Sequence, residues 1–233
     1  MAAMTDWRTF WDSDHSIYVN ARHKDVHYRD IAEQVAAFVP GPSARVLDYG
    51  CGEALHAELV AAVAGELLLS DSAPTVRGQM ATRFARNPRI KVLAPVEVEL
   101  LPDQSLDLIV SNSVMQYLTE AEADRLLVLW RRLLKPDGVL IVADVIPPDV
   151  GALSDVVALV RYATRHGFLL AALAGMARTA VSPYRKLRSQ LGIAQYTQAQ
   201  FMNKLTAAGL TAERLARNLE HNPSRMTFRA RPA

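Results

Sequence analysis

The sequence has few cysteines, little net charge and no long apolar run, and each of these properties excludes some classes of protein. Among its 233 residues there is one cysteine, Cys51, so no disulfide can form within the chain, as is usual in a reducing compartment. Neither sign of charge dominates: the formal net charge is +2, which gives no global indication of nucleic-acid binding. The longest uncharged apolar run, 167–177, is far shorter than the roughly 20 residues of a membrane-spanning helix. The N-terminal stretch MAAMTDWRTFWDSDH lacks the apolar centre of a secretory signal, and we therefore expect a cytoplasmic protein.

Short apolar runs alternate with helical patterns through the first two thirds of the chain. The runs are continuous, which is typical of strands buried on both faces. Candidate strands are 45–49, 67–70, 90–93, 106–111 and 139–143. Candidate helices are 25–39, 54–64, 75–86 and 120–134, the last stopped by a turn at 135–138. This alternation predicts a parallel sheet with helices on both faces.

The alternation is interrupted after Asp144. Residues 150–192 are rich in alanine and leucine and predict a mostly helical insertion. A helix at 198–208, a strand near 211–217 and a last strand at 225–230 follow, and the alternating pattern of the last one suits a sheet edge. We expect one α/β domain, 1–233, with a doubly wound, mostly parallel seven-stranded sheet, N-terminal lid helices within 1–39 and a helical cap at 150–192.

Two glycines beside carboxylates follow the first strand, in the stretch Val46-Leu47-Asp48-Tyr49-Gly50-Cys51-Gly52-Glu53-Ala54. In open parallel sheets, ligands bind beyond the carboxyl ends of the strands. Glycines there let the backbone turn sharply and approach a ligand, and a helix starting at Glu53 would offer free N–H groups. A phosphate favours a basic or neutral turn, whereas Asp48 and Glu53 suit a ligand with a cationic end. The ammonium and sulfonium of S-adenosylmethionine fit this pattern.

A second carboxylate supports the same ligand. Asp71 closes the second strand, at about the 20-residue spacing from a glycine turn at which an acidic residue can accept both hydroxyls of a ribose. Asp48, the strand before the turn, the helix after it and Asp71 together predict a cofactor site.

With these motifs the chain resembles class I S-adenosylmethionine-dependent methyltransferases, of the small-molecule branch that includes the quinone-biosynthesis type. VLDYGCG is similar to the first motif of that family, LLLSD to its acidic second-strand end, and LDLIVSNSVMQYL and LLKPDGVLIVAD to the later strands. Two positions depart from the pattern: Ala54 replaces a third glycine, and 93–96 lacks the carboxylate that often binds the adenine amino group.

The resemblance implies a Rossmann-like fold and a set of site residues. The implied cofactor-binding residues are Tyr18, Arg22, Asp48, Gly50, Cys51, Gly52, Asp71, Ser72 and Asn112. By this resemblance Tyr18 lies near the sulfonium, Arg22 meets the cofactor carboxylate and Asn112 lies near its amino group. Gln116, Tyr117 and His221 are candidates for binding the acceptor, and His221 is the candidate general base, with Tyr18 beside the transferred methyl group.

Other side chains have less specific patterns. Cys51 has no evident base, so we expect packing and not nucleophilic catalysis. Of His15, His23 and His27, only the last two have helical spacing, and no carboxylate near them in the sequence completes a metal site, so we expect no metal. The insertion carries six basic residues against one acidic one, Asp155. Its basic face is either solvated surface or a contact for lipid or for an apolar, anionic acceptor.

The functional hypothesis is methyl transfer from S-adenosylmethionine to a small, bulky or apolar acceptor. A protein or RNA methyltransferase is an alternative and would need a macromolecule-binding appendage, for which the basic insertion is the candidate. A NAD-dependent oxidoreductase is another, but the turn lacks the third glycine of GxGxxG and no catalytic dyad is visible. We expect no nucleic-acid partner, and the oligomeric state stays open.

Overall fold

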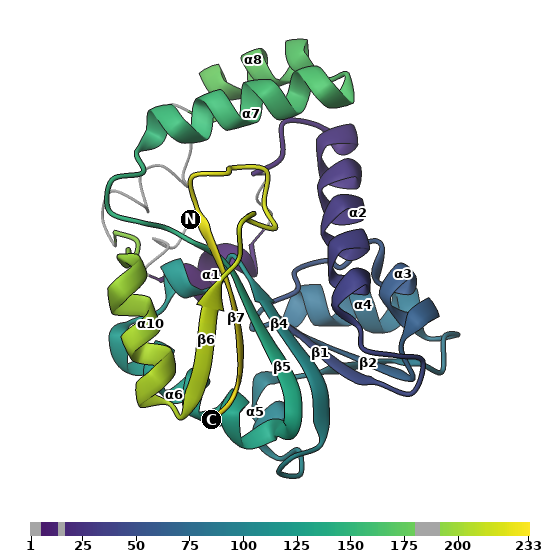
Figure 1. The fold of residues 1–233 in the computed structure, drawn as a ribbon. Helices are drawn as coiled ribbons and strands as arrows, with labels where there is room; N and C mark the ends of the chain where they lie inside the picture. The colour runs from purple at the N-terminus through teal and green to yellow at the C-terminus, as the bar shows by residue number, and fades with distance from the viewer. Residues whose placement is uncertain (1–5, 14–16, 180–191) are drawn as a thin grey trace.

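A seven-stranded sheet forms the centre of the computed structural model, which describes residues 6–13, 17–179 and 192–233. The strand order is β3-β2-β1-β4-β5-β7-β6 (Figure 1). The strands are β1 (Arg45–Tyr49), β2 (Glu66–Ser70), β3 (Ile90–Leu93), β4 (Leu106–Asn112), β5 (Leu134–Val145), β6 (Leu210–Arg214) and β7 (Met226–Pro232). All pairings are parallel except those of β7 with β5 and β6. The predicted mostly parallel, seven-stranded α/β fold is confirmed.

The strand order reverses between β1 and β4, which are direct neighbours. The carboxyl ends of these two strands therefore form the crevice in which open α/β sheets bind ligands. The prediction of an edge position for the last strand was wrong, since β7 lies between β5 and β6, and β6 forms the edge. The alternating pattern of β7 corresponds to its burial, since Phe228 and Ala230 are buried whereas Arg229 is half-buried and Arg231 is exposed.

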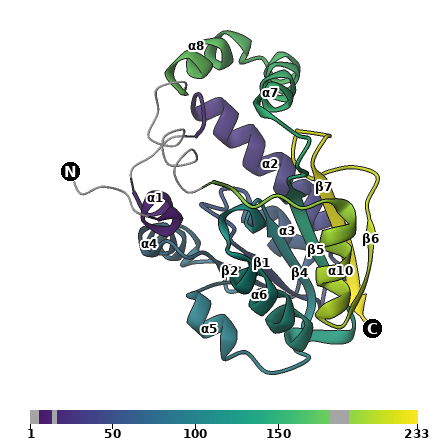
Figure 2. The same ribbon diagram turned by 90° about the vertical axis from the view of Figure 1, so that its left-hand side faces the viewer.

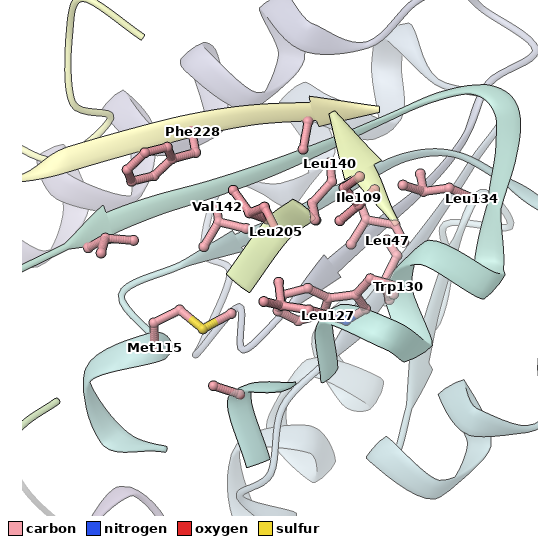
Figure 3. Packing of buried hydrophobic residues seen from close by; sticks show 14 of the residues in the cluster. Leu47, Ile109, Met115, Leu127, Trp130, Leu134, Leu140, Val142, Leu205 and Phe228 are labelled. Atoms are coloured by element: carbon pink, nitrogen blue, oxygen red, sulfur yellow. The ribbon is translucent and has the colours of Figure 1, made fainter. Parts of the chain in front are cut away.

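Neighbouring residues of the central strands point to opposite faces and build two cores. Leu47, Leu68 and Ile109 belong to one cluster, with Trp130 of α6 (Glu120–Leu133) and Phe201 of α10 (Gln198–Ala207). Figure 3 shows this cluster, with Leu127 and Trp130 packed below the strands. The other face carries the second cluster, under α2 (Ala21–Phe38), α3 (Ala57–Val63) and α4 (Pro74–Phe84). Burial on both faces explains the continuous apolar runs.

Several element boundaries differ from those predicted. Helix α2 starts four residues before the predicted 25, because the Asn20 side chain accepts a hydrogen bond from the His23 backbone N–H and caps the helix. Strand β5 begins at Leu134, so the predicted turn at 135–138 lies within it as an irregularity of the β4–β5 register. The short helix α1 (Trp7–Trp11) lies within the N-terminal segment, 1–39, for which lid helices were expected without individual bounds, and α5 (Pro95–Glu99) was not predicted.

Helices α7 (Ala152–His166) and α8 (Leu169–Thr179) form the described part of the predicted helical insertion. They cross the amino-terminal end of α2, away from the sheet (Figure 1). On the other side, α1 lies beside α4 (Figure 2), where the Thr75 N–H donates to the Asp12 carboxylate at 2.7 Å. Within the described ranges, no helix has both the length and the apolarity required to cross a bilayer.

Candidate functional site

One large cavity opens at the carboxyl ends of β1, β2 and β4. Its volume is about 2440 Å³ as lined by the described residues. Helices α1, α2, α7 and the β6–β7 loop contribute to its walls. It brings together all predicted site residues except Arg22: Tyr18, Asp48, Gly50, Cys51, Gly52, Asp71, Ser72, Asn112, Gln116, Tyr117 and His221.

The glycine turn after β1 requires the conformations that glycine allows. Gly50 and Gly52 have φ angles of +75° and +57°, in the left-handed region. A Cβ atom on Gly50 would lie 2.2 Å from Val114 Cγ2, and one on Gly52 would lie 2.6 Å from the Tyr28 hydroxyl. These glycines therefore admit close packing of the protein's own side chains, in addition to leaving space for a ligand.

The segment after the turn departs from the prediction. Ala54 was expected inside a helix starting at Glu53, but it is left-handed, with a φ of +45°. Helix α3 begins only at Ala57. The Glu53 N–H is held instead by the Tyr28 hydroxyl, which accepts its hydrogen bond at 3.0 Å.

Asp48 and Asp71 place two carboxyl groups beside the turn. Asp71 accepts a hydrogen bond from the Gly52 N–H at 3.0 Å and one from the Ala73 N–H at 2.9 Å. Burial raises the pKa of Asp71, and these backbone donors partly oppose it. Burial, together with the neighbouring Asp71, raises the pKa of Asp48 to about 7. Among the described residues neither carboxylate forms an ion pair, so the pair favours a ligand that brings positive charge.

The start of α2 forms the wall opposite the turn. The Tyr18 ring lies 5.3 Å from that of His27 and 5.8 Å from that of Tyr28, and burial raises its pKa well above the usual range. Arg22 does not reach this wall, because its Nε donates to the His166 carbonyl at 2.6 Å and so ties α2 to the end of α7. The helix start at Ala21 turns Arg22 toward α7, which the sequence pattern did not indicate.

A cluster of two histidines and a glutamate lies on the cavity wall between α2 and the β6–β7 loop. Glu220 Oε2 lies 3.5 Å from His27 Nδ1 and 3.4 Å from His221 Nδ1. Its Oε1 accepts a hydrogen bond from the Asn112 amide at 2.8 Å. Burial alone would raise the pKa of Glu220, but the two histidines and the amide outweigh it and hold the pKa far below the usual range.

Sequence reasoning missed Glu220, although it singled out His221, the next residue in the loop. The only local signal was an acidic residue directly before His221, ahead of the last strand. Its partner His27 lies on α2, and that pairing arises only in the folded chain.

A second buried ion pair fixes the β6–β7 loop. Arg225 contacts Asp144 at 2.6 Å and Asp155 of α7 at 2.8 Å. Asp144 also accepts a hydrogen bond from the Ser113 hydroxyl at 2.8 Å. Burial raises the pKa of Asp144 to about 6, although Arg225 opposes the shift. This network joins β5, the loop and the insertion next to the cavity.

The remaining predicted residues have packing partners of different kinds. Cys51 packs in the second core cluster, its Sγ 3.6 Å from Met80 Sδ, and burial raises the pKa of its thiol. Gln116 is buried, and its backbone carbonyl accepts a hydrogen bond from the Ala194 N–H at 2.9 Å. The Tyr117 ring lies 4.7 Å from that of Trp7 on α1.

Comparison with known proteins identifies the domain. Residues 47–142 match the family described as methyltransferase domain. Two Mycobacterium tuberculosis proteins, each named as a probable S-adenosylmethionine-dependent methyltransferase, are 32% identical over 142 residues. The match covers 60% of this chain and 47% of each relative, so the chain spans about half the length of the curated relatives it matches.

Solved structures agree on the fold. The magnesium protoporphyrin IX methyltransferase of Synechocystis PCC 6803, with bound SAH, aligns over 96% of this chain and 92% of its own with a TM-score of 0.59 and 17% identity. A Haemonchus contortus phosphoethanolamine N-methyltransferase aligns over 61% of this chain and 32% of its own with a TM-score of 0.51 and 24% identity. The family match covers residues 47–142, which include the glycine turn and the acidic end of β2, so this part of the chain is a methyltransferase domain, and the solved structures share its fold.

Proposed function

We propose that this chain transfers a methyl group from S-adenosylmethionine to a small molecule bound in the same cavity. The observation that carries the proposal is the pair Asp48 and Asp71 at the glycine turn. Both carboxyl groups have raised pKa values, and neither has a basic side chain as ion-pair partner among the described residues. A ligand with an ammonium and a sulfonium compensates such a site electrostatically.

The residues present fit this cofactor. Each oxygen of Asp71 already accepts one backbone N–H, which fixes the plane of the carboxylate and leaves further lone pairs for the two ribose hydroxyls. Asp48 at the end of β1 would face the methionine part, with Gly50, Cys51 and Gly52 as the floor. Ser72 and Asn112 extend the same edge of the sheet, as lining residues of the cavity.

When bound, the cofactor supplies an electrophilic methyl group. The chain's own contribution would be to align the acceptor with that group and to exclude water. Tyr18, on the wall formed by α2, is suited to contact the region of the sulfonium. His221 lines the same cavity, and we assign it the role of general base for acceptors that are poorly ionised.

The acceptor is inferred from the size and lining of the cavity. A volume of about 2440 Å³ exceeds the roughly 300–1,000 Å³ of ordinary ligand pockets, which leaves room for a bulky acceptor beside the cofactor. Val156, Leu159 and Met176 of the insertion contribute apolar lining, and Gln116 and Tyr117 would contact the acceptor from the β4 side. The two solved relatives named above act on a porphyrin and on phosphoethanolamine, so likeness of fold does not select the acceptor.

A lipid surface is a second candidate contact of the insertion. Leu153 on α7 and Leu170 on α8 are 77% and 83% exposed, and Arg161 and Arg165 are exposed on α7. Exposed leucines beside arginines suit an anionic membrane surface. The basic face expected from the sequence includes four more residues whose side chains the structure does not describe: Arg178, Arg185, Lys186 and Arg188. The same basic surface is the only feature in the described part of the chain that would favour the alternative of a protein or RNA substrate.

The proposal is tested by calorimetry with S-adenosylmethionine and S-adenosylhomocysteine, followed by transfer of a labelled methyl group to a panel of apolar and anionic acceptors. We expect one cofactor site per chain and labelled product from at least one acceptor class. Binding of NAD in place of both cofactors would support the oxidoreductase alternative. Labelling of protein or RNA alone would support a macromolecular acceptor.

A further inference from the structure

Three groups that bind metal ions in proteins meet on the wall of the cavity. His27 comes from α2, whereas Glu220 and His221 come from the β6–β7 loop at the other end of the chain. One nitrogen from each histidine and one oxygen from the carboxylate lie within 4.8 Å of one another. Two histidines and a carboxylate are a recurrent ligand set of divalent metal sites.

The separations within the cluster fit shared coordination better than hydrogen bonding. Glu220 Oε2 lies 3.5 Å from His27 Nδ1 and 3.4 Å from His221 Nδ1. An N–H···O hydrogen bond is usually about 2.7–3.2 Å long. Ligands at about 2.0–2.2 Å from a tetrahedral ion are separated by about 3.4 Å, the edge of the tetrahedron. Both of these distances are close to that edge, and the nitrogens of the two histidines lie within 4.8 Å of one another.

The surroundings of the cluster are also those of a supported site. The Asn112 amide donates to the other oxygen of Glu220 at 2.8 Å and so orients the carboxylate, as residues around metal ligands commonly do. His221 Nδ1 is buried and lacks a hydrogen-bond partner among the described residues. His23, which is 5% exposed, accepts the Val19 N–H at Nδ1 and leaves its buried Nε2 without a hydrogen-bond partner there as well. Buried polar atoms without partners are uncommon and call for an explanation.

We propose that His27, Glu220 and His221 bind one divalent transition-metal cation, of the Zn²⁺ or Co²⁺ type. Two imidazoles with one carboxylate favour such borderline ions over Mg²⁺ and Ca²⁺, which prefer sites made of oxygen ligands. Three protein ligands leave at least one coordination position open, and all three residues line the cavity. This departs from the expectation of no metal, which was based on the helical spacing of His23 and His27 and on the lack of a carboxylate near them in the sequence to complete a site.

The open position has a use that rests on the proposed function. An acceptor hydroxyl or carboxylate bound to the ion would be fixed toward the cofactor, and a bound hydroxyl would lose its proton more readily. With the ion present, His221 holds the metal, and the ion takes over the activation of the acceptor. The site therefore selects acceptors with a metal-binding oxygen.

The test uses the full chain without a histidine tag, freed of metal by a chelator. Co²⁺ is titrated and followed by its d–d absorption, and Zn²⁺ binding is measured by calorimetry, both without S-adenosylmethionine. We expect one ion per chain and at least about tenfold weaker binding in His27→Gln, Glu220→Gln and His221→Asn. His56→Asn is the matched control, since His56 also pairs with a carboxylate, Asp25 at 2.8 Å, but belongs to no such triad; it should bind the ion normally.

A measurement on the unaltered chain keeps the test valid if the variants fail to fold, as judged by circular dichroism. Zn²⁺ should protect His27 and His221, but not His56, from modification by diethyl pyrocarbonate. Three results would each overturn the proposal. The first is that the unaltered chain shows no saturable metal binding, and the second is that His56→Asn weakens metal binding as much as the three ligand variants do. The third is that Zn²⁺ does not change the reactivity of His27 and His221 toward diethyl pyrocarbonate. Cofactor binding is measured separately, so metal binding without S-adenosylmethionine binding would count against the proposed function and not against the metal site.

Discussion

Replacing Asp48 by asparagine should stabilise the protein without cofactor, and by an amount that depends on pH. The Asp48 carboxyl group lines the cavity, and burial with the nearby Asp71 raises its pKa from 3.8 to about 7. Between these two values the folded chain binds a proton that the unfolded chain has already released. The free energy of unfolding therefore falls as the pH rises through this window, and the loss is complete above pH 7.

The size of the effect follows from the shift. A change of about three pKa units corresponds to about 4 kcal/mol at 1.36 kcal/mol per unit. This is an upper limit, because Asp48 is half-buried against a cavity that admits water. The asparagine side chain would carry no charge, so the variant should match the unaltered chain near pH 4 and exceed it by up to this amount at pH 8. No described group donates a hydrogen bond to the Asp48 carboxylate, so the substitution by asparagine breaks no such hydrogen bond.

The assay is thermal or urea unfolding of both proteins from pH 4.5 to 8. For a chain of this length each kcal/mol corresponds to about 2–4 °C in Tm. S-adenosylmethionine should then raise the Tm of the unaltered protein more than that of Asp48→Asn at pH 8, because the cation compensates the carboxylate. A stability difference that stays constant over this pH range would refute the electrostatic reasoning, and equal stabilisation by the cofactor would remove Asp48 from the cofactor site.

Three further predictions concern the end of β2, the glycine turn and the exposed face of α7. Asp71→Ala should weaken S-adenosylmethionine binding by at least about tenfold, because charge-assisted hydrogen bonds contribute roughly 1.5–3 kcal/mol each. The control in calorimetry is Asp103→Ala, which replaces an exposed aspartate that does not line the cavity and should bind the cofactor normally. Unchanged affinity of Asp71→Ala would exclude Asp71 from the site. Gly50→Val should abolish cofactor binding, because a Cβ atom at this position would lie 2.2 Å from Val114 Cγ2 and the backbone φ is +75°. Val114→Ala serves as the reference for the effect of losing the Val114 side chain alone. Normal cofactor binding by a folded Gly50→Val protein would contradict the structure of the turn. Replacing Arg161 and Arg165 together by glutamine should reduce turnover of an anionic acceptor or binding to anionic vesicles without changing cofactor affinity, whereas unaffected turnover and vesicle binding would assign both arginines to solvated surface.

The elements around the cofactor turn could be predicted because their signals are local. Apolar runs with both faces buried indicated β1 and β4 closely, and the pair Gly50 and Gly52 indicated the turn. The order of the last two strands could not be predicted, since antiparallel insertion of β7 between β5 and β6 depends on how a long chain segment returns to the sheet. The start of α2 was misplaced because its cap, Asn20, was not recognised as one.

The side-chain contacts of α2 and of the β6–β7 loop were harder to predict for a physical reason. His221 was identified by its place before the last strand, but Glu220 is defined by partners on α2 and β4 that lie far away in the chain. The family resemblance implied that Arg22 meets the cofactor, whereas its Nε donates a hydrogen bond to the His166 carbonyl. Contacts between distant segments depend on the rotation of each helix, and helical spacing alone does not fix that rotation.

Most of the unfavourable local conformations in the described part of the chain lie at the same edge of the sheet. Of the four left-handed residues other than glycine, Ala54, Ser113 and Asp144 line the cavity, and only Gln104 does not. Such conformations cost on the order of 1–3 kcal/mol each, and the raised pKa of Asp48 adds a further cost at neutral pH. The two apolar clusters on either side of the sheet contain no comparable charge, so they are the source of the stability that holds this edge in place. Ligands that bring positive charge to the turn relieve part of the cost, and the edge should therefore be the region of the protein whose stability depends most on what is bound there.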